Sequence, residues 1–161
     1  MYTIGIDLGG TNIVASVVDD EYKIIGTSKT PTNAPRSADE IFDDIAEVCE
    51  EAVKAANLTM ADIDSVGMGT PGTVNQDGII EFANNLAFNN VPARTMLAKR
   101  LNKPEEKIYI ENDANCAALG EAYAGVGNGA KDFVAVTLGT GVGSGVIIDG
   151  KKIKVPEGTT V

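Results

Sequence analysis

The sequence has no histidine and only two cysteines among its 161 residues. Without histidine, the chain cannot form Ser-His or Cys-His nucleophilic pairs, or metal sites built on histidine. The cysteines, Cys49 and Cys116, lie in helical patterns beside small or apolar residues. We interpret both as core residues that form neither a disulfide nor a metal site. Any chemistry of this chain must therefore use carboxylates, hydroxyl groups and backbone dipoles.

Positive charge is also scarce, because 13 Lys and Arg residues face 23 Asp and Glu residues, for a formal net charge of −10. Nucleic acids and anionic membrane surfaces bind basic proteins, so this balance argues against both as partners. No apolar run is long enough to span a bilayer, and the start, MYTIGIDLGG, lacks the features of a signal peptide. We therefore expect a cytoplasmic protein.

Glycine, by contrast, is abundant, and the segment VTLGTGVGSGV has it at every second position from Gly139 to Gly145. The spacing does not fit the dinucleotide motif G-x-G-x-x-G, and the chain continues as VIIDG, which is typical of a strand and a turn. A glycine-rich turn between two strands can direct several backbone N–H groups at an anion.

A similar pattern begins the chain, since residues 4–20 align without a gap with residues 134–150, placing Leu8 on Leu138. We interpret the match as an internal duplication of a β-hairpin with a glycine-rich bend. Each hairpin alone could be an ordinary tight turn, since glycine suits positive φ. The pair predicts two turns that hold one polyphosphate between them.

Hydrophobic periodicity and turn residues predict the remaining elements. Ser37 and Glu40 form a capping-box pattern that begins a helix ending near Asn57. Further helices are expected over 92–101 and 112–125, and strands over 3–8, 13–18, 22–28, 64–72, 107–111, 133–138 and 144–149.

Four motifs carry a resemblance to a known family: DLGGTN at 7–12, GMGTPG at 67–72, ENDANCAALGE at 111–121 and LGTGVGSGVIIDGK at 138–151. Together they resemble the ROK family, which joins bacterial sugar kinases with related repressors, and their order and spacing are most similar to its glucokinases. The resemblance implies an α/β, actin-like ATPase (ribonuclease-H-like) fold. In that fold two lobes close over the nucleotide phosphates and the sugar.

The resemblance also implies the nucleotide site, with ATP and Mg²⁺ as cofactors. The residues that match the two phosphate motifs are Gly9, Gly10, Thr11 and Asn12 in the first and Gly139, Thr140 and Gly141 in the second. Asp7 lies at an acidic strand end that can orient the hydration shell of Mg²⁺. No direct protein ligand of a metal is expected, and the zinc loop of the family has no counterpart in this chain.

On the sugar side, Asn112 and Asp113 match the sugar-binding pair of the family, and Gly72, with Asn84 or Asn85, matches its sugar-side loop. Asp113 falls on the position of the catalytic base. A sugar hydroxyl is a poor nucleophile near neutral pH, and a nearby carboxylate can accept its proton during phosphoryl transfer. Outside this motif, Asn112 or Asp113 would more simply be a helix cap.

The resemblance implies a complete first lobe over residues 1–111 and the start of a second lobe over 112–161. The family continues with a histidine segment that helps to bind the sugar, so we expect these residues to be an N-terminal part with negligible kinase activity alone. Because the family is often dimeric, a homodimer is one expectation.

Three functions remain open from the sequence. The first is ATP-dependent phosphorylation of a hexose in carbohydrate metabolism and glycolysis, with glucose ahead of N-acetylated hexosamines, mannose and fructose. The second is a sugar-responsive regulator of the same family, which would carry a DNA-binding segment before the strand that begins at Thr3. The third is a nucleotide-binding module without sugar chemistry, for which the Asn112–Asp113 pair would have no use.

Overall fold

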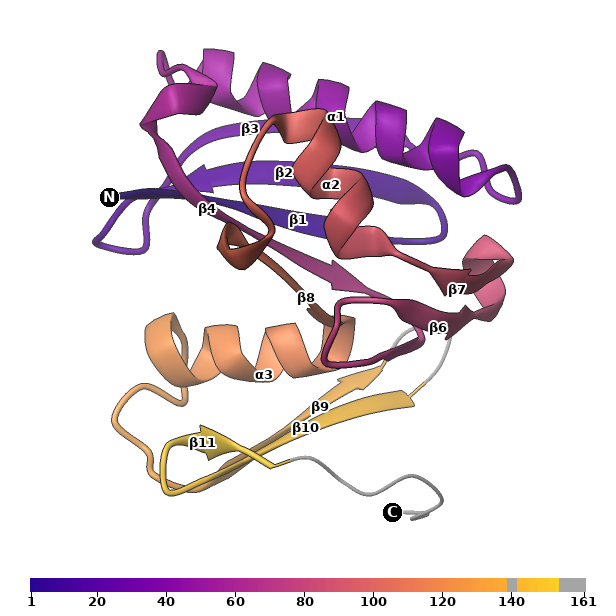
Figure 1. Ribbon diagram of the computed structural model, residues 1–161. Coiled ribbons are helices and arrows are strands. Elements are labelled where there is room, and N and C mark those ends of the chain that lie inside the picture. Colours follow the sequence, from indigo (N-terminus) through magenta and orange to yellow (C-terminus); the bar gives the residue numbers. More distant parts are fainter. Residues whose placement is uncertain (139–141, 154–161) are drawn as a thin grey trace. The chain divides into compact units, whose positions relative to one another are not determined.

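The strands and helices of the computed structural model, which describes residues 1–138 and 142–153, fall into two units, Met1–Asn112 and Asp113–Val161 (Figure 1). The first unit contains a five-stranded sheet in the order β3 (Ile24–Pro31), β2 (Asn12–Val18), β1 (Tyr2–Leu8), β4 (Ile63–Thr70) and β8 (Ile108–Asn112). Strands β1, β2 and β3 are antiparallel neighbours, whereas β1, β4 and β8 run parallel. The carboxyl ends of three parallel strands therefore meet at one edge, which is the usual position of ligand sites in α/β proteins.

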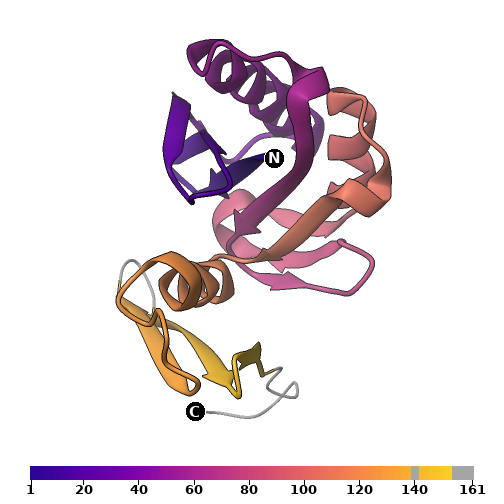
Figure 2. The same ribbon diagram turned by 90° about the vertical axis from the view of Figure 1, so that its left-hand side faces the viewer.

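Two helices supply the crossovers that parallel strands require. Helix α1 (Ala38–Ala55) connects β3 to β4, and α2 (Ala93–Leu101) precedes β8. The two helices contact each other and cover one side of the sheet, as Figure 2 shows. The predicted capping box of α1 is confirmed, because the Ser37 hydroxyl accepts from the Glu40 N–H while the Ser37 N–H donates to the Glu40 carboxylate.

The core lies between this side of the sheet and the helices. Strand alternation places Ile4, Ile6 and Leu8 of β1 in it, each no more than 4% exposed. Helix α1 faces it with an apolar stripe at helical spacing, made of Ile41, Phe42, Ile45, Val48, Cys49, Ala52 and Val53. Cys49 is thus a core residue, as predicted.

A small antiparallel sheet, which the sequence did not predict, lies between β4 and α2 along the chain. It consists of β5 (Thr73–Val74), β6 (Ile80–Ala83) and β7 (Phe88–Val91). A 3₁₀ turn, Asn84–Leu86, joins β6 to β7, and two more such turns, Met60–Asp62 and Glu105–Lys107, precede β4 and β8. In Figure 1 the small sheet lies toward the end of the main sheet at which β4 points.

In the second unit, α3 (Asp113–Ala124) packs against a hairpin of β9 (Phe133–Leu138) and β10 (Val142–Ile148), and β11 (Lys151–Lys152) pairs with β10. Two valines of β9, Val134 and Val136, are 58% and 59% exposed. Within the described ranges, no helix of either unit is long and apolar enough to cross a membrane.

The two glycine-rich segments both form antiparallel hairpins, but their registers differ. In the first hairpin Leu8 pairs with Ile13, whereas in the second Leu138 pairs with Val142. The gap-free alignment of the sequence would pair Leu138 with Gly143 instead. A register shift of one residue moves every side chain of one strand to the opposite face of the sheet. Val134 and Val136 of β9, which are exposed, therefore correspond in the alignment to Ile4 and Ile6 of β1, which are buried.

Candidate active site

The turn between β1 and β2 lies at the carboxyl end of β1, where the first phosphate motif was predicted. The Gly9 N–H donates to the Asn12 carbonyl at 2.9 Å and so closes the turn. Thr32, which is fully buried, donates its hydroxyl to the Gly9 carbonyl at 2.6 Å and its N–H to the Thr11 carbonyl at 2.8 Å. In the part of the chain that the structure describes, the N–H groups of Gly10 and Thr11 donate no hydrogen bond. Two unpaired donors in one turn suit an anion.

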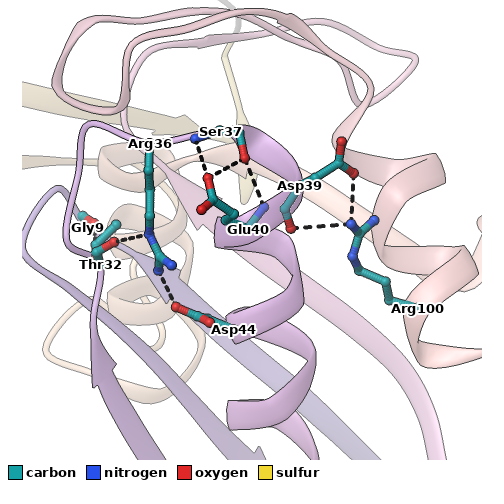
Figure 3. A network of polar contacts seen from close by, with 8 residues as sticks. All are labelled: Gly9, Thr32, Arg36, Ser37, Asp39, Glu40, Asp44 and Arg100. Atoms are coloured by element: carbon teal, nitrogen blue, oxygen red, sulfur yellow. Dashed lines mark hydrogen bonds and ion pairs between the residues drawn. The ribbon is translucent and has the colours of Figure 1, made fainter.

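Thr32 is in turn held by Arg36, as Figure 3 shows. The Arg36 Nε donates to the Thr32 carbonyl at 2.8 Å, and the guanidinium group forms an ion pair with Asp44 of α1. The turn at Gly9 is therefore connected through two side chains to the first helix. The preceding segment TPTNAP, residues 30–35, is rich in turn residues, and nothing in that pattern indicates these contacts.

Gly10 brings the turn between β1 and β2 close to the predicted sugar-side loop. A Cβ built on Gly10 would lie 3.3 Å from the Asn85 Cβ, in the 3₁₀ turn Asn84–Leu86. A side chain at position 10 would crowd that turn. Glycine here thus permits a close approach between residues that were predicted for two different ligands.

Gly72 and Asn112 extend this set of contacts. The Asn112 side-chain amide donates to the Gly72 carbonyl at 3.0 Å. Gly72 has a φ of +92°, and a Cβ there would lie 2.0 Å from the Phe82 carbonyl, so only glycine fits. Phe82 lies in β6, just before the 3₁₀ turn Asn84–Leu86. A continuous path of contacts within the first unit therefore runs from Asn112 through Gly72 and this turn to Gly10.

Two carboxylates flank a glycine on one row of the main sheet. Asp7 of β1 pairs with Gly69 of β4, and Gly69 pairs with Glu111 of β8. Residues in one row share a face, and strands two positions apart are separated by about 10 Å. Among the described residues, no three His, Cys, Asp or Glu side chains form a metal-binding group. Mg²⁺ bound beside phosphate groups usually keeps several waters and takes only one or two carboxylates from a protein.

Asp113 is the first residue of α3, and its carboxylate is exposed to solvent. Its Oδ1 accepts a hydrogen bond from the Ala114 N–H at 2.7 Å. No described residue donates a hydrogen bond to Oδ2. Asp113 thus makes a helix-end contact with one oxygen and has the other available as a proton acceptor.

Two glycines of the second hairpin pack against α3. A Cβ on Gly143 would lie 2.7 Å from the Ala114 Cβ, and a Cβ on Gly145 would lie 2.3 Å from the Ala118 Cβ. These glycines allow α3 to lie directly on β10 and so fix the position of its first residue. The predicted phosphate residues of this hairpin, Gly139, Thr140 and Gly141, lie outside the described residues.

Comparison with known proteins supplies independent information. The sequence model of the ROK family matches residues 3–160. A glucokinase of Streptomyces coelicolor is 41% identical over 150 residues, which are 92% of this chain and 44% of that protein. A xylose repressor of Caldicellulosiruptor bescii is 34% identical over 156 residues, which are 92% of this chain and 37% of that protein.

A solved structure is also similar: that of a ROK family glucokinase from Streptomyces griseus in complex with glucose and AMPPNP. It has a TM-score of 0.86 and 37% identity, and the match covers 97% of this chain and 47% of that one. This likeness confirms the predicted α/β, actin-like fold. The chain spans less than half the length of the curated relatives described above.

Proposed function

The chain belongs to the ROK family, and on that premise we propose that its full-length gene product is an ATP-dependent hexose kinase, with glucose as the leading substrate. The observation that carries the proposal is the path of contacts from Asn112 through Gly72 to the 3₁₀ turn and Gly10. It brings residues suited to a polyhydroxyl ligand next to a turn suited to phosphate. The similar glucokinases support the same conclusion.

On the nucleotide side, the N–H groups of Gly10 and Thr11 would bind phosphate oxygens, together with the Asn12 side chain. Gly9 shapes the turn, because its own N–H is already used. ATP supplies the phosphoryl group when bound, and Mg²⁺ neutralises its charge. Asp7 would hold that ion through its waters. The second phosphate turn is assigned to Gly139, Thr140 and Gly141, on the strength of the motif.

On the sugar side, the hydrogen bond to Gly72 fixes the Asn112 amide, which binds sugar hydroxyls together with Asn84 and Asn85. Asp113 follows Asn112 directly and presents an exposed carboxylate. As the sugar oxygen forms its bond to the γ-phosphorus and the bond to ADP breaks, Asp113 accepts the hydroxyl proton. Most of the rate would come from alignment and from stabilisation of phosphoryl charge.

The division of the structure after Asn112 supports the proposal that residues 1–111 form one lobe and 112–161 begin a second, with the boundary one residue later.

An enzyme that uses ATP and a hexose belongs in the cytoplasm, where both substrates occur. A homodimer remains part of the proposal, and light scattering of the purified protein measures it directly.

The test is a coupled ADP-release assay with ATP, Mg²⁺ and a panel of glucose, mannose, fructose and N-acetylated hexosamines. It is run on the full-length gene product and, to test the expected inactivity of the segment, on the 161 residues alone. We expect Asp113→Asn to lower kcat by about 10²- to 10⁴-fold while nucleotide binding is retained. The control Asp20→Asn changes an exposed carboxylate of the first unit and should leave kcat unchanged.

Failure of the full-length product to phosphorylate any hexose of the panel would refute the kinase proposal. The second candidate is then a sugar-responsive regulator, which the similarity to a xylose repressor favours. Calorimetry with the same sugars separates the two, since a regulator binds sugar without ADP release.

A further inference from the structure

We propose that Thr32 and Arg36 are positioning residues that keep the N–H groups of Gly10 and Thr11 unpaired and directed at the phosphate groups of a nucleotide. The identity of the anion rests on the proposed function. The positioning itself rests on the hydrogen bonds of the first unit.

The direction of the Gly10 N–H is set by the peptide group that Gly10 shares with Gly9. In a planar trans peptide the carbonyl of one residue and the N–H of the next point in opposite directions. The Gly9 carbonyl is held by the buried Thr32 hydroxyl at 2.6 Å. The Gly10 N–H therefore points away from Thr32, in the direction opposite to the Gly9 carbonyl. Loss of the hydroxyl would release this peptide plane.

Thr11 lies directly before β2, at the end of the ladder between β2 and β3. Asn12 of β2 pairs with Pro31 of β3, so the next pair in the antiparallel ladder is Thr11 with Thr32. A hydrogen-bonded pair in such a ladder exchanges two bonds. Only one is present, from the Thr32 N–H to the Thr11 carbonyl at 2.8 Å. The Thr32 carbonyl, which would accept from the Thr11 N–H, accepts from the Arg36 Nε instead, at 2.8 Å.

Arg36 thus interrupts the ladder at the pair that borders the turn. Its guanidinium group forms an ion pair with Asp44 of α1, so the first helix holds the arginine in the position that interrupts the ladder (Figure 3). Without the arginine, the carbonyl of Thr32 becomes available to the N–H of Thr11. The ladder would then extend by one bond, and the turn would lose a donor that it offers to an anion.

The experiment combines amide hydrogen exchange with kinetics on the full-length gene product. In the ligand-free protein, we expect the Thr11 amide to exchange rapidly and to become protected in Arg36→Met. In the kinase assay, Arg36→Met should raise KM for ATP by about 10- to 100-fold, the usual effect of one hydrogen bond to a charged group. KM for the sugar should change less than about twofold.

Two further comparisons separate positioning from general stability. Thr32→Val removes the hydroxyl and should also raise KM for ATP, whereas Thr32→Ser keeps it and should restore the wild-type value. Arg100→Met removes another ion-paired arginine, which bonds to Asp39 and Asp43 of α1 (Asp39 is shown in Figure 3), and should change thermal stability but not KM for ATP.

The outcomes distinguish this inference from the proposed function. An unprotected Thr11 amide in Arg36→Met, with an unchanged KM for ATP, would overturn the positioning role. Protection of Thr11 as expected, in a protein that neither binds ATP with Mg²⁺ nor phosphorylates a sugar, would confirm the interrupted ladder. In that case the nucleotide assignment, and the kinase proposal with it, is what fails.

Discussion

Gly145→Ala tests whether the glycines of β10 set the position of α3 and so of Asp113. The added Cβ would lie 2.3 Å from the Ala118 Cβ and 3.1 Å from the Ala114 carbonyl oxygen. Carbon atoms in good contact are about 3.5 to 4.0 Å apart. The helix and the strand would therefore have to separate by about 1 Å. No side-chain rotation can relieve the overlap, because the backbone fixes the position of each Cβ, and Ala118 is fully buried.

The size of the effect follows from this overlap. Added methyl groups in a close-packed interior destabilise by about 1 to 3 kcal/mol. We expect the upper part of that range, because the obstacle is a buried Cβ and a backbone carbonyl. The displacement should also lower kcat by about 10²-fold in the full-length gene product, since a misplacement of about 1 Å at a reacting group has effects of that order.

Urea unfolding, followed through amide protection of α3, measures the destabilisation, and the coupled assay measures kcat. Gly120→Ala is the matched control, since Gly120 lies in the same helix and its Cβ would have no atom within 4 Å. It should stabilise α3 by about 0.5 to 1 kcal/mol through helix propensity. Ala118→Gly should partly rescue Gly145→Ala. Wild-type stability and kcat in Gly145→Ala would refute the argument that backbone contact positions the helix.

Two other changes test the first unit. Gly72→Ala should destabilise it by more than about 1 kcal/mol, because φ there is +92° and the new Cβ would lie 2.0 Å from a carbonyl oxygen of β6; a wild-type urea midpoint would contradict this. Burial raises the pKa of the Cys49 thiol from 9.0 to about 12. The folded state then binds the thiol proton more tightly than the unfolded state does. The contribution of this thiol to the free energy of unfolding is therefore fully present below pH 9.0 and is lost as pH rises toward 12. Cys49→Ala should therefore show a smaller loss of stability than the wild type between neutral pH and about pH 10.5, and parallel pH profiles would exclude the effect.

The main sheet and α1 were predictable because local signals agreed with the fold. Alternating apolar residues indicated β1 and β2, and the capping box at Ser37 indicated where α1 begins. The small sheet was missed because its strands have only two to four residues each, and two asparagines, Asn89 and Asn90, interrupt the apolar pattern of β7. The Asp77–Gly78 dipeptide between Val74 and Ile80 is nevertheless a hairpin signal. In the structure the Asn75 side chain accepts from the Asp77 and Ile79 N–H groups and closes this turn.

The candidate site was predictable by residue type but not by contact. The motifs indicated Gly10 for phosphate and Asn85 for sugar, and no pattern in the sequence places these residues side by side. Their contact depends on the turn between β6 and β7, an element that the sequence did not predict. Thr32 and Arg36 were missed for a different reason. Their roles depend on the direction of single peptide groups, which residue spacing does not determine.

The glycines of the two hairpins show why glycine alone does not identify a phosphate turn. Gly143 and Gly145 are required by the packing of α3, and Gly10 by the approach of Asn85. An anion instead needs N–H groups without a protein partner, and one of the two in the first turn belongs to a residue that is not glycine, Thr11. In a hairpin, the neighbouring strand would normally take up such a group. In the ladder between β2 and β3, the Thr32 carbonyl that would accept from the Thr11 N–H accepts from the Arg36 Nε, which is the basis of the positioning role that we propose for this arginine.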